Sequence, residues 1–181
     1  MKKIKSFTII EMLVAMLIFT LIIGGSIVLM QQTLVMISLA NQRLVAYYLA
    51  QEGIELARNV RDNNWLQQPS DITYPWDAGF FSLGTPDLEI DYNDLYSKNK
   101  NVSSFYSYAG KYFYLDNNGY TYNTPCSSAS ANNCTSFKRR INVSDEADGS
   151  ILIECYVEWR ERGREHSVMI QDKLYNWYGI Q

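Results

Sequence analysis

The chain begins with a long apolar segment that contains a single charged residue. Apolar and small polar side chains fill the run from Phe7 to Met30, which is 24 residues long. A helix of this length and composition can cross the hydrocarbon core of a membrane. Glu11 is the only charged residue between Lys5 and Arg43. A carboxylate at the centre of such a helix costs about 2.5–3.5 kcal/mol, so Glu11 indicates a function that supplies it with a partner.

Helical periodicity continues beyond the apolar run. Apolar and small residues recur at spacings of three or four in two sets, which is the pattern of an amphipathic helix. We expect one set to pack on the chain's own sheet and the other on neighbouring subunits of an assembly. The polar group Asp62-Asn63-Asn64, followed by Pro69, predicts the end of the helix. The two sets are Met36, Ala40, Leu44, Tyr47, Ala50, Ile54 and Ala57, and Val45, Leu49, Gly53, Leu56 and Val60.

Strand patterns follow the helix after an irregular stretch. Residues 66–110 carry three prolines and many Asp, Asn and Ser residues, so we expect loops there, with one short strand at residues 88–92. A hairpin is predicted at residues 112–122, around a turn at 116–119. Two-residue alternation then predicts three further strands, the last two joined by a turn at Arg162-Gly163. Their alternating positions are Phe137, Arg139, Ile141 and Val143; Ile151, Ile153, Cys155, Val157 and Trp159; and Val168, Ile170 and Leu174.

These patterns predict an α+β fold. A long N-terminal helix, whose first half spans a membrane, packs through its second half on a C-terminal antiparallel sheet of about four strands. The predicted parts are a basic segment at 1–6, a transmembrane half-helix at 7–30, an amphipathic half-helix at 31–62, and an exterior domain at 63–181 with a variable loop at 66–110.

Charge predicts the orientation in the membrane. Lys2, Lys3 and Lys5 precede the apolar run, and lysines in this position hold that end in the cytoplasm. The run is too long for an ordinary secretory signal, and no A-x-A pattern closes it. The whole chain has a net charge of −3, and without the three lysines of residues 1–6 it has a net charge of −6. This balance does not favour nucleic-acid binding, which requires a basic face.

Three cysteines lie on the part of the chain that is predicted to be outside the cytoplasm, where disulfides persist. Cys126 and Cys134 bracket a polar loop, and we favour a bridge between them. Cys155 lies on the apolar face of a predicted strand, which suits a buried thiol. The odd number leaves open a bridge from Cys155 to one of the other two. No spacing typical of a metal site accompanies the single histidine, so no metal or cofactor is predicted.

The first 30 residues resemble the class III signal of type IV pilin-like proteins. The residues that carry the resemblance are MKKIKS followed by FTIIEMLVAMLIFTLIIG. The resemblance implies that a membrane prepilin peptidase removes residues 1–6 as a leader by cutting between Ser6 and Phe7, that Phe7 is then N-methylated, and that Glu11 is the family's acidic residue. Two departures are Ser6, where the family normally has Gly, and the absence of proline from the first 68 residues. Residues 50–65 also resemble the helix junction of many minor-pilin-like proteins, and residues 157–177 resemble the terminal hairpin of minor pilins and pseudopilins.

Elementary electrostatics gives this signal a physical role. Cleavage before Phe7 creates a positive α-amino group at a helix N-terminus, which already carries partial positive charge. In a bundle of such helices, Glu11 of one subunit can neutralise Phe7 of a neighbour, because neither charge is tolerated alone in lipid. The alternative is a signal-anchor helix that tolerates a glutamate near the membrane interface.

Other candidate chemistry is weaker. His166 lies between Glu165 and Ser167, but adjacent strand residues point to opposite faces, so we expect a strand or surface histidine. Carboxylates at Asp87, Glu89, Asp91 and Asp94 suit calcium by type but match no strong motif, and a solvated loop is favoured. Lys138-Arg139-Arg140 is the only basic cluster of the exterior domain, and pairing of Lys138 or Arg140 with Glu154 or Glu158 is favoured over DNA contact. No phosphate loop, nucleophile elbow or zinc signature indicates an enzyme.

The function expected from this resemblance is that of a structural subunit, a minor pilin of a type IV pilus. The implied partners are a prepilin peptidase, other pilin subunits, an inner-membrane assembly platform and the membrane, without nucleic acid. Before assembly the protein would cross the membrane once, and afterwards it would lie in a cell-surface or periplasmic filament. Two alternatives stay open: a pseudopilin of type II secretion or competence, and a signal-anchored exterior binding domain that never polymerises.

Overall fold

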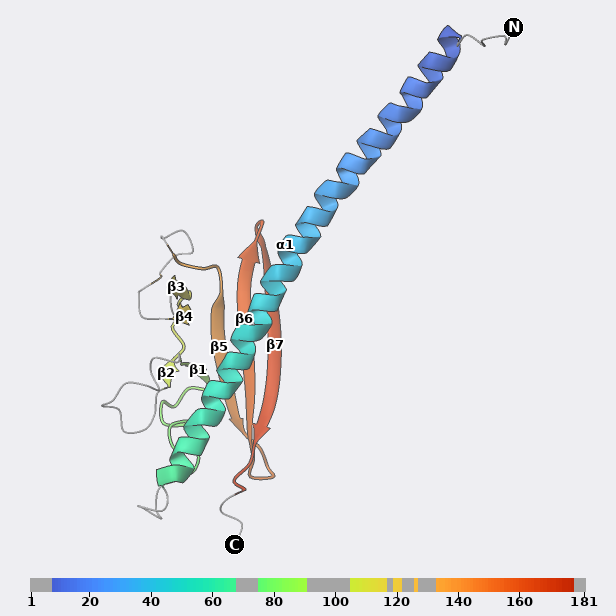
Figure 1. Ribbon diagram of the computed structural model, residues 1–181. Coiled ribbons are helices and arrows are strands. Elements are labelled where there is room, and N and C mark those ends of the chain that lie inside the picture. The colour runs from blue at the N-terminus through green and yellow to red at the C-terminus, as the bar shows by residue number, and fades with distance from the viewer. Residues whose placement is uncertain are drawn as a thin grey trace. The chain divides into compact units, whose positions relative to one another are not determined.

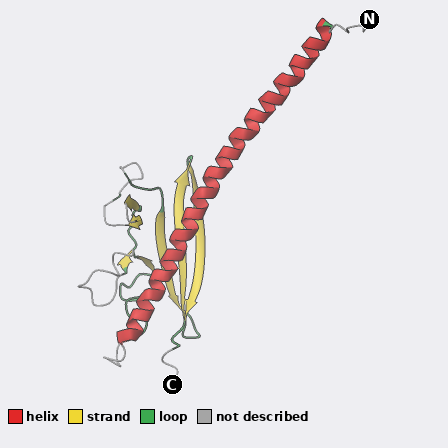
Figure 2. Cartoon of the chain, viewed as in Figure 1, coloured by secondary structure: helices red, strands yellow, loops and turns green. Residues whose placement is uncertain are grey.

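The computed structural model describes residues 8–67, 75–90, 105–116, 119–121, 126 and 133–177. Over these residues the chain forms one helix, α1 (Ile9–Gln67), and seven strands that follow it (Figures 1 and 2). The chain divides into two compact units, Met1–Gln42 and Arg43–Gln181, which we describe separately. A long apolar helix and a C-terminal antiparallel sheet confirm the predicted α+β class.

The main sheet has five strands in the order β2-β1-β5-β6-β7. Its three long strands are β5 (Lys138–Asp145), β6 (Ile151–Glu161) and β7 (Arg164–Leu174), which pair antiparallel over their whole lengths. The short strands β1 (Asp87–Glu89) and β2 (Tyr106–Ser107) extend the sheet beyond β5. Arg162 and Gly163 both have positive φ at the β6–β7 turn, so the predicted turn is confirmed.

The predicted hairpin stands apart from this sheet. Strands β3 (Tyr114–Asp116) and β4 (Gly119–Thr121) pair with each other as a separate two-stranded sheet. The meander of about four strands is therefore replaced by a five-stranded sheet and a small hairpin. The backbone of Phe113 joins the hairpin segment to the chain before β5, since its N–H donates to Phe137 at 3.0 Å and its carbonyl accepts from Thr135 at 2.8 Å. These main-chain bonds are tertiary contacts that the local sequence pattern does not predict.

The core of the second unit, Arg43–Gln181, which we call the exterior unit after the location predicted for it, lies between the C-terminal part of α1 and the inner face of β5, β6 and β7 (Figure 1). The helix and the sheet approach closely at Gly53, because an added Cβ would lie 2.6 Å from Cys155 Sγ and 3.0 Å from Arg139 Cδ. The inner positions predicted to be apolar are buried, with Ile141, Ile153, Cys155 and Val157 completely so, and Arg139 is a charged residue on the same face. A residue with no side chain is thus required where the helix crosses β5 and β6.

Helix α1 ends at Gln67, later than the predicted end at Asp62-Asn63-Asn64. The side-chain amide of Asn64 is buried and donates to the carbonyls of Trp76 and Ala78, each at 2.9 Å. Trp65 is also buried, and its ring N–H donates to Asn176 Oδ1 at 3.3 Å. Asn favours turns over helix interiors because its side chain can form hydrogen bonds with nearby backbone groups in non-helical conformations. Here Asn64 is engaged by a distant loop, so the helix continues.

Candidate functional site

The N-terminal end of α1 has the geometry of a capped helix. The backbone N–H of Glu11 donates to the carbonyl of Thr8 at 3.1 Å and to its hydroxyl oxygen at 3.4 Å. Thr8 and Glu11 have the spacing of a capping box, a signal that the sequence interpretation above did not use. A carboxylate in the first turn also complements the partial positive charge of a helix N-terminus. Glu11 therefore has a local electrostatic role at the helix start, besides any role towards another subunit.

Ser6 and Phe7, the predicted cleavage residues, lie outside the described residues. The basic segment at 1–6 lies outside them as well. The structure gives no geometry for the cleavage site, and its assignment continues to rest on the sequence.

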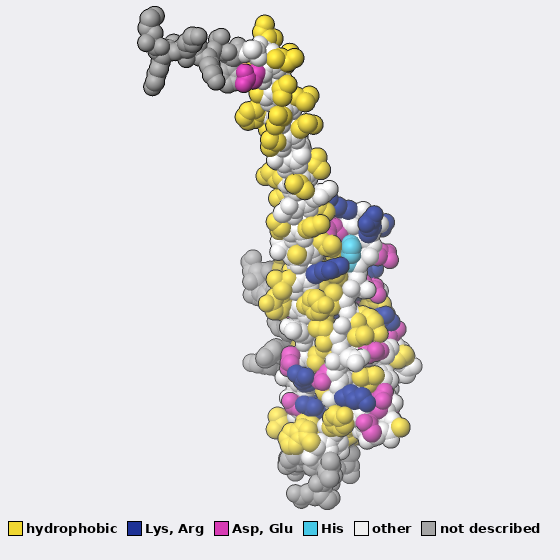
Figure 3. Space-filling model, turned by 90° about the vertical axis from the view of Figure 1, so that its right-hand side faces the viewer, with side chains coloured by type: hydrophobic (Ala, Val, Ile, Leu, Met, Phe, Trp, Pro, Cys, Tyr) yellow, Lys and Arg dark blue, Asp and Glu magenta, His cyan; other side chains and the backbone are white. Residues whose placement is uncertain are grey.

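The N-terminal part of α1 exposes its apolar side chains on all sides. From Ile9 to Met30, every large apolar side chain is between 50 and 83 % exposed. Figure 3 shows these hydrophobic side chains covering the visible face of the helix, with charged side chains on the exterior unit. The helix is long and apolar enough to cross a membrane by length and composition. An isolated soluble chain does not leave so large an apolar surface open to water, so this surface requires lipid or other helices.

Three hydroxyl side chains within this apolar part of the helix are satisfied locally. The hydroxyl groups of Thr20, Ser26 and Thr33 donate to main-chain carbonyls three or four residues earlier, at 2.8, 2.8 and 2.9 Å. A lipid environment requires such internal partners, because it offers none of its own. Glu11 is the one charged residue in residues 9–42 of the helix, and bonds of this kind do not neutralise its carboxylate.

The two helical sets predicted from the sequence have different surroundings in the exterior unit. Leu49, Gly53, Leu56 and Val60 of the second set are buried, and so are Ala50, Ile54 and Ala57 of the first. Leu44 and Tyr47 of the first set remain 53 and 49 % exposed, and Tyr48 beside them is 63 % exposed. The sheet thus covers a face made from both sets. The surface formed by Leu44, Tyr47 and Tyr48 is available for another molecule.

The basic cluster of β5 is largely used inside the fold. Arg139 is only 1 % exposed, and its guanidinium donates to the carbonyls of Leu49 at 2.8 Å and Ile90 at 2.6 Å and pairs with Glu52 at 3.2 Å. Arg140 bonds the carboxylate of Asp87 at 3.2 Å and lies over the ring of Tyr156. Lys138 places its ammonium 4.3 Å from the ring centre of Tyr112. The expected pairing with Glu154 or Glu158 is replaced by these contacts, and the cluster forms no continuous basic face.

The acidic group before the sheet is also engaged by protein. Asp87 accepts bonds from Arg140 and from the side-chain amide of Asn142 at 3.0 Å. Glu89 is 2 % exposed, pairs with Lys111 at 2.8 Å and accepts from the Ala109 N–H at 3.2 Å. Asp91 and Asp94 lie outside the described residues. Within the described ranges, no group of three or more metal-ligating side chains occurs.

The cysteines have the favoured arrangement. Cys126 and Cys134 form a disulfide, and Cys155 is a buried free thiol. Burial raises the pKa of the Cys155 thiol from 9.0 to about 11, although the nearby Arg139 charge acts in the opposite direction. A thiol of this kind stays protonated at neutral pH and is a poor nucleophile. Cys155 is therefore a packing residue in contact range of Gly53.

Comparison with known proteins gives a result for the N-terminal segment. Residues 1–27 match the family model described as the prokaryotic N-terminal methylation motif. No curated protein matches the chain, and no solved structure does. The motif and the exposed apolar helix together support a membrane-anchored protein with a prepilin-type signal. They support a type IV pilin-like protein, and the long helix packed on an antiparallel sheet is consistent with the pilin α+β fold.

Proposed function

We propose that this chain is a minor pilin, a structural subunit of a type IV pilus or a related filament. The observation that carries the proposal is the combination of the methylation motif at residues 1–27 with Glu11 as the single charged residue in the exposed apolar part of α1, residues 9–42. A structural subunit needs only surfaces that pack, so the proposal does not require catalytic residues. A pseudopilin of a secretion or competence system uses the same physical principles and is the nearest alternative.

In this proposal a prepilin peptidase cuts between Ser6 and Phe7, and Phe7 is then N-methylated. Removal of Lys2, Lys3 and Lys5 takes away the charges that hold this end in the cytoplasm. The new α-amino group and Glu11 of a neighbouring subunit then neutralise each other in lipid. The assembly platform extracts the subunit, and the apolar side chains of α1 exchange lipid for neighbouring helices. The surface formed by Leu44, Tyr47 and Tyr48 extends this contact into the exterior unit.

The first experiment measures the intact mass and N-terminal sequence of the membrane-expressed chain, with and without an active prepilin peptidase. The expected product begins at Phe7 and is heavier by one methyl group. A chain that still begins at Met1 in the presence of the peptidase would contradict the proposal. That result would favour the signal-anchored binding domain, for which Ser6 in the usual place of Gly is the specific observation.

The second experiment tests assembly through Glu11. Glu11→Ala should abolish incorporation into sheared filaments while the protein remains in the membrane, because the α-amino group of a neighbour would lose its counter-charge. Glu55→Ala is the matched control, since Glu55 is an exposed carboxylate of the same helix that pairs only with Arg58 among the described residues. Equal incorporation of the two variants would refute the role proposed for Glu11.

A further inference from the structure

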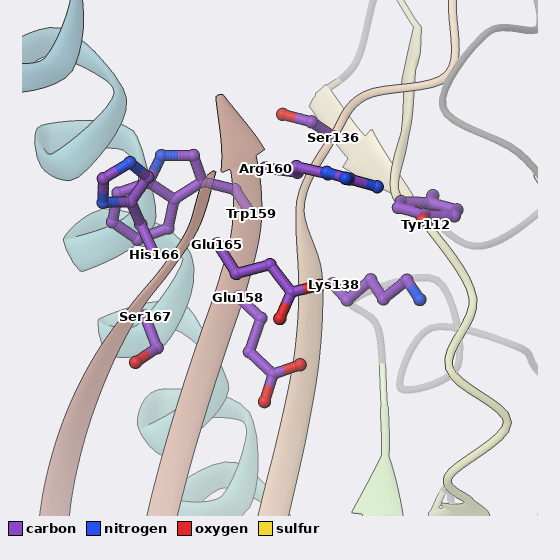
Figure 4. Close-up of a pocket in the computed structure, with 9 residues that line it drawn as sticks. All are labelled: Tyr112, Ser136, Lys138, Glu158, Trp159, Arg160, Glu165, His166 and Ser167. Carbon is purple, nitrogen blue, oxygen red and sulfur yellow. The ribbon is translucent and has the colours of Figure 1, made fainter. Parts of the chain in front are cut away.

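A polar pocket lies on the outer face of the main sheet, on the side away from α1. Its volume is about 300 Å³, and strands β5, β6 and β7 supply most of its walls (Figure 4). This volume is at the lower end of the range for small-molecule sites. The lining residues are Tyr112, Ser136, Lys138, Glu158, Trp159, Arg160, Glu165, His166 and Ser167.

Four charged side chains of the pocket balance one another in sign. Lys138 is opposite Glu158 in the β5–β6 register, and Arg160 is opposite Glu165 in the β6–β7 register. Residues that are directly opposite have Cβ atoms about 4.5–5.5 Å apart, which is close enough for an ion pair. In the part of the chain that the structure describes, none of these four takes part in an ion pair. The pocket therefore presents two carboxylates and two cations that are not paired with another charge among the described residues.

The adjacent row of side chains on the outer face differs from the pocket, because its charged residue is paired. There, Arg140 is bound to Asp87 and covers the ring of Tyr156. The same outer face thus contains one row whose charge is paired within the fold and, next to it, a pocket whose charged side chains form no ion pair among the described residues. Lys138 is held by the ring of Tyr112, which keeps its ammonium at the pocket wall and away from Glu158.

Packed aromatic side chains support the pocket from beneath. Trp159 alternates with Glu158 and Arg160 along β6, so its side chain lies on the opposite face of the strand. It is 3 % exposed and stacks on His166, with ring centres 5.4 Å apart. Phe137 packs on its other side at 5.9 Å. This packing fixes the strand positions that present the charged side chains, which lowers the cost of ordering them around a ligand.

We propose that this pocket binds a neutral, hydroxyl-rich ligand, namely one sugar ring of a saccharide. Carboxylates only accept hydrogen bonds, and Lys and Arg only donate them. A hydroxyl group does both, so adjacent hydroxyls of one sugar satisfy Glu158 and Arg160 at the same time. A simple anion or cation leaves two like charges of the pocket unmatched. The inference does not rest on filament assembly, because every lining residue lies outside α1.

The test uses the full chain in a polyoxyethylene detergent, which has neither a sugar nor a zwitterionic headgroup. Saturation-transfer NMR is recorded with the methyl glycosides of glucose, galactose, mannose and N-acetylglucosamine, and with phosphocholine and sulfate as the zwitterionic and anionic probes. At least one glycoside is expected to bind. Glu158→Gln and Arg160→Gln should each weaken this binding about tenfold or more, because each removes a charged hydrogen-bond partner.

Glu154→Gln is the matched control, since Glu154 belongs to the same strand but does not line the pocket. It should leave glycoside binding unchanged, and circular dichroism should show all three variants folded. The proposal is overturned if no glycoside binds, if binding survives both pocket substitutions, or if phosphocholine or sulfate is the only probe that binds. A chain that is not cut by the peptidase would refute the assembly proposal and leave this result unaffected.

Discussion

Substitution of Gly53 by alanine is the sharpest test of how α1 packs on the sheet. The added Cβ would lie 2.6 Å from Cys155 Sγ and 3.0 Å from Arg139 Cδ. The first distance is shorter than any ordinary contact of a methyl group, so one of the neighbours has to move. Cys155 is held in β6, and the Arg139 guanidinium is held by bonds to Leu49 and Ile90. Neither neighbour can withdraw without disturbing other contacts.

The expected effect is the difference between two opposing terms. Replacing glycine by alanine inside a helix favours the helix by about 1 kcal/mol. Overpacking a filled core costs about 1–3 kcal/mol. The difference between the two terms is about 0–2 kcal/mol, and with two restrained neighbours we expect Gly53→Ala to lower the free energy of unfolding by the upper half of this range, about 1–2 kcal/mol. For a domain of this size the melting temperature should fall by about 3–6 °C.

Thermal and urea unfolding of the full chain in detergent, followed by tryptophan fluorescence, measures this effect. Gln51→Ala is the control for helix propensity, since Gln51 is exposed two positions away on the same helix. The double variant Gly53→Ala/Cys155→Ala removes the closest clash, and the two substitutions should couple by about 0.5 kcal/mol or more. A Gly53→Ala protein as stable as the parent, or additive effects in the double variant, would refute the packing argument.

Three further predictions concern the exterior unit. Arg139→Met should lower the free energy of unfolding by about 2–4 kcal/mol in urea titrations, because buried carbonyls and Glu52 lose a charged donor. The more exposed Arg140 is the comparison, and Arg140→Met should cost about 1 kcal/mol or less. Equal losses for the two variants would contradict the argument from their difference in burial. Cys155 should react with a thiol reagent only after unfolding. Because the pKa of the folded thiol is raised, its contribution to stability is complete below about pH 9 and is lost as the pH rises towards 11. Cys155→Ala should remove this loss of stability at high pH. A fast reaction in the folded state would disprove this assignment. Cys126→Ser/Cys134→Ser should cost about 2.5 kcal/mol in thermal unfolding, since the bridge closes a loop with a sequence separation of 8, and an unchanged melting temperature would show that the bridge does not constrain the unfolded chain.

Much of the fold could be predicted from the sequence because its signals are local. The apolar run determines the first part of α1, and two-residue alternation gives β5, β6 and β7 with their buried faces. Gly163, in a turn that requires positive φ, marks the β6–β7 connection. Each of these signals depends on neighbours a few positions away in the chain. The disulfide between Cys126 and Cys134 belongs to the same category, because the two residues bracket one loop.

The features that sequence reasoning missed depend on distant contacts. Lys138, Arg139 and Arg140 are consecutive basic residues, yet they meet an aromatic ring, buried carbonyls and a carboxylate respectively. Alternation along a strand predicts that Arg139 points inward, but only the approach of Leu49 and Ile90 makes an inward charge tolerable. The capping geometry at Thr8 and Glu11 is a missed signal of another kind, since its spacing was present in the sequence.

The sequence by itself determined the long apolar helix, the prepilin-type signal and the α+β class. Hydrophobic length, charge placement and side-chain period are properties of short segments, and they hold whatever the rest of the chain does. Only the tertiary structure decided that the hairpin leaves the main sheet, that α1 runs to Gln67, and that Glu158, Arg160 and Glu165 surround one pocket. These outcomes depend on which strands pair and in which register, and register is a relation between segments that no single segment carries.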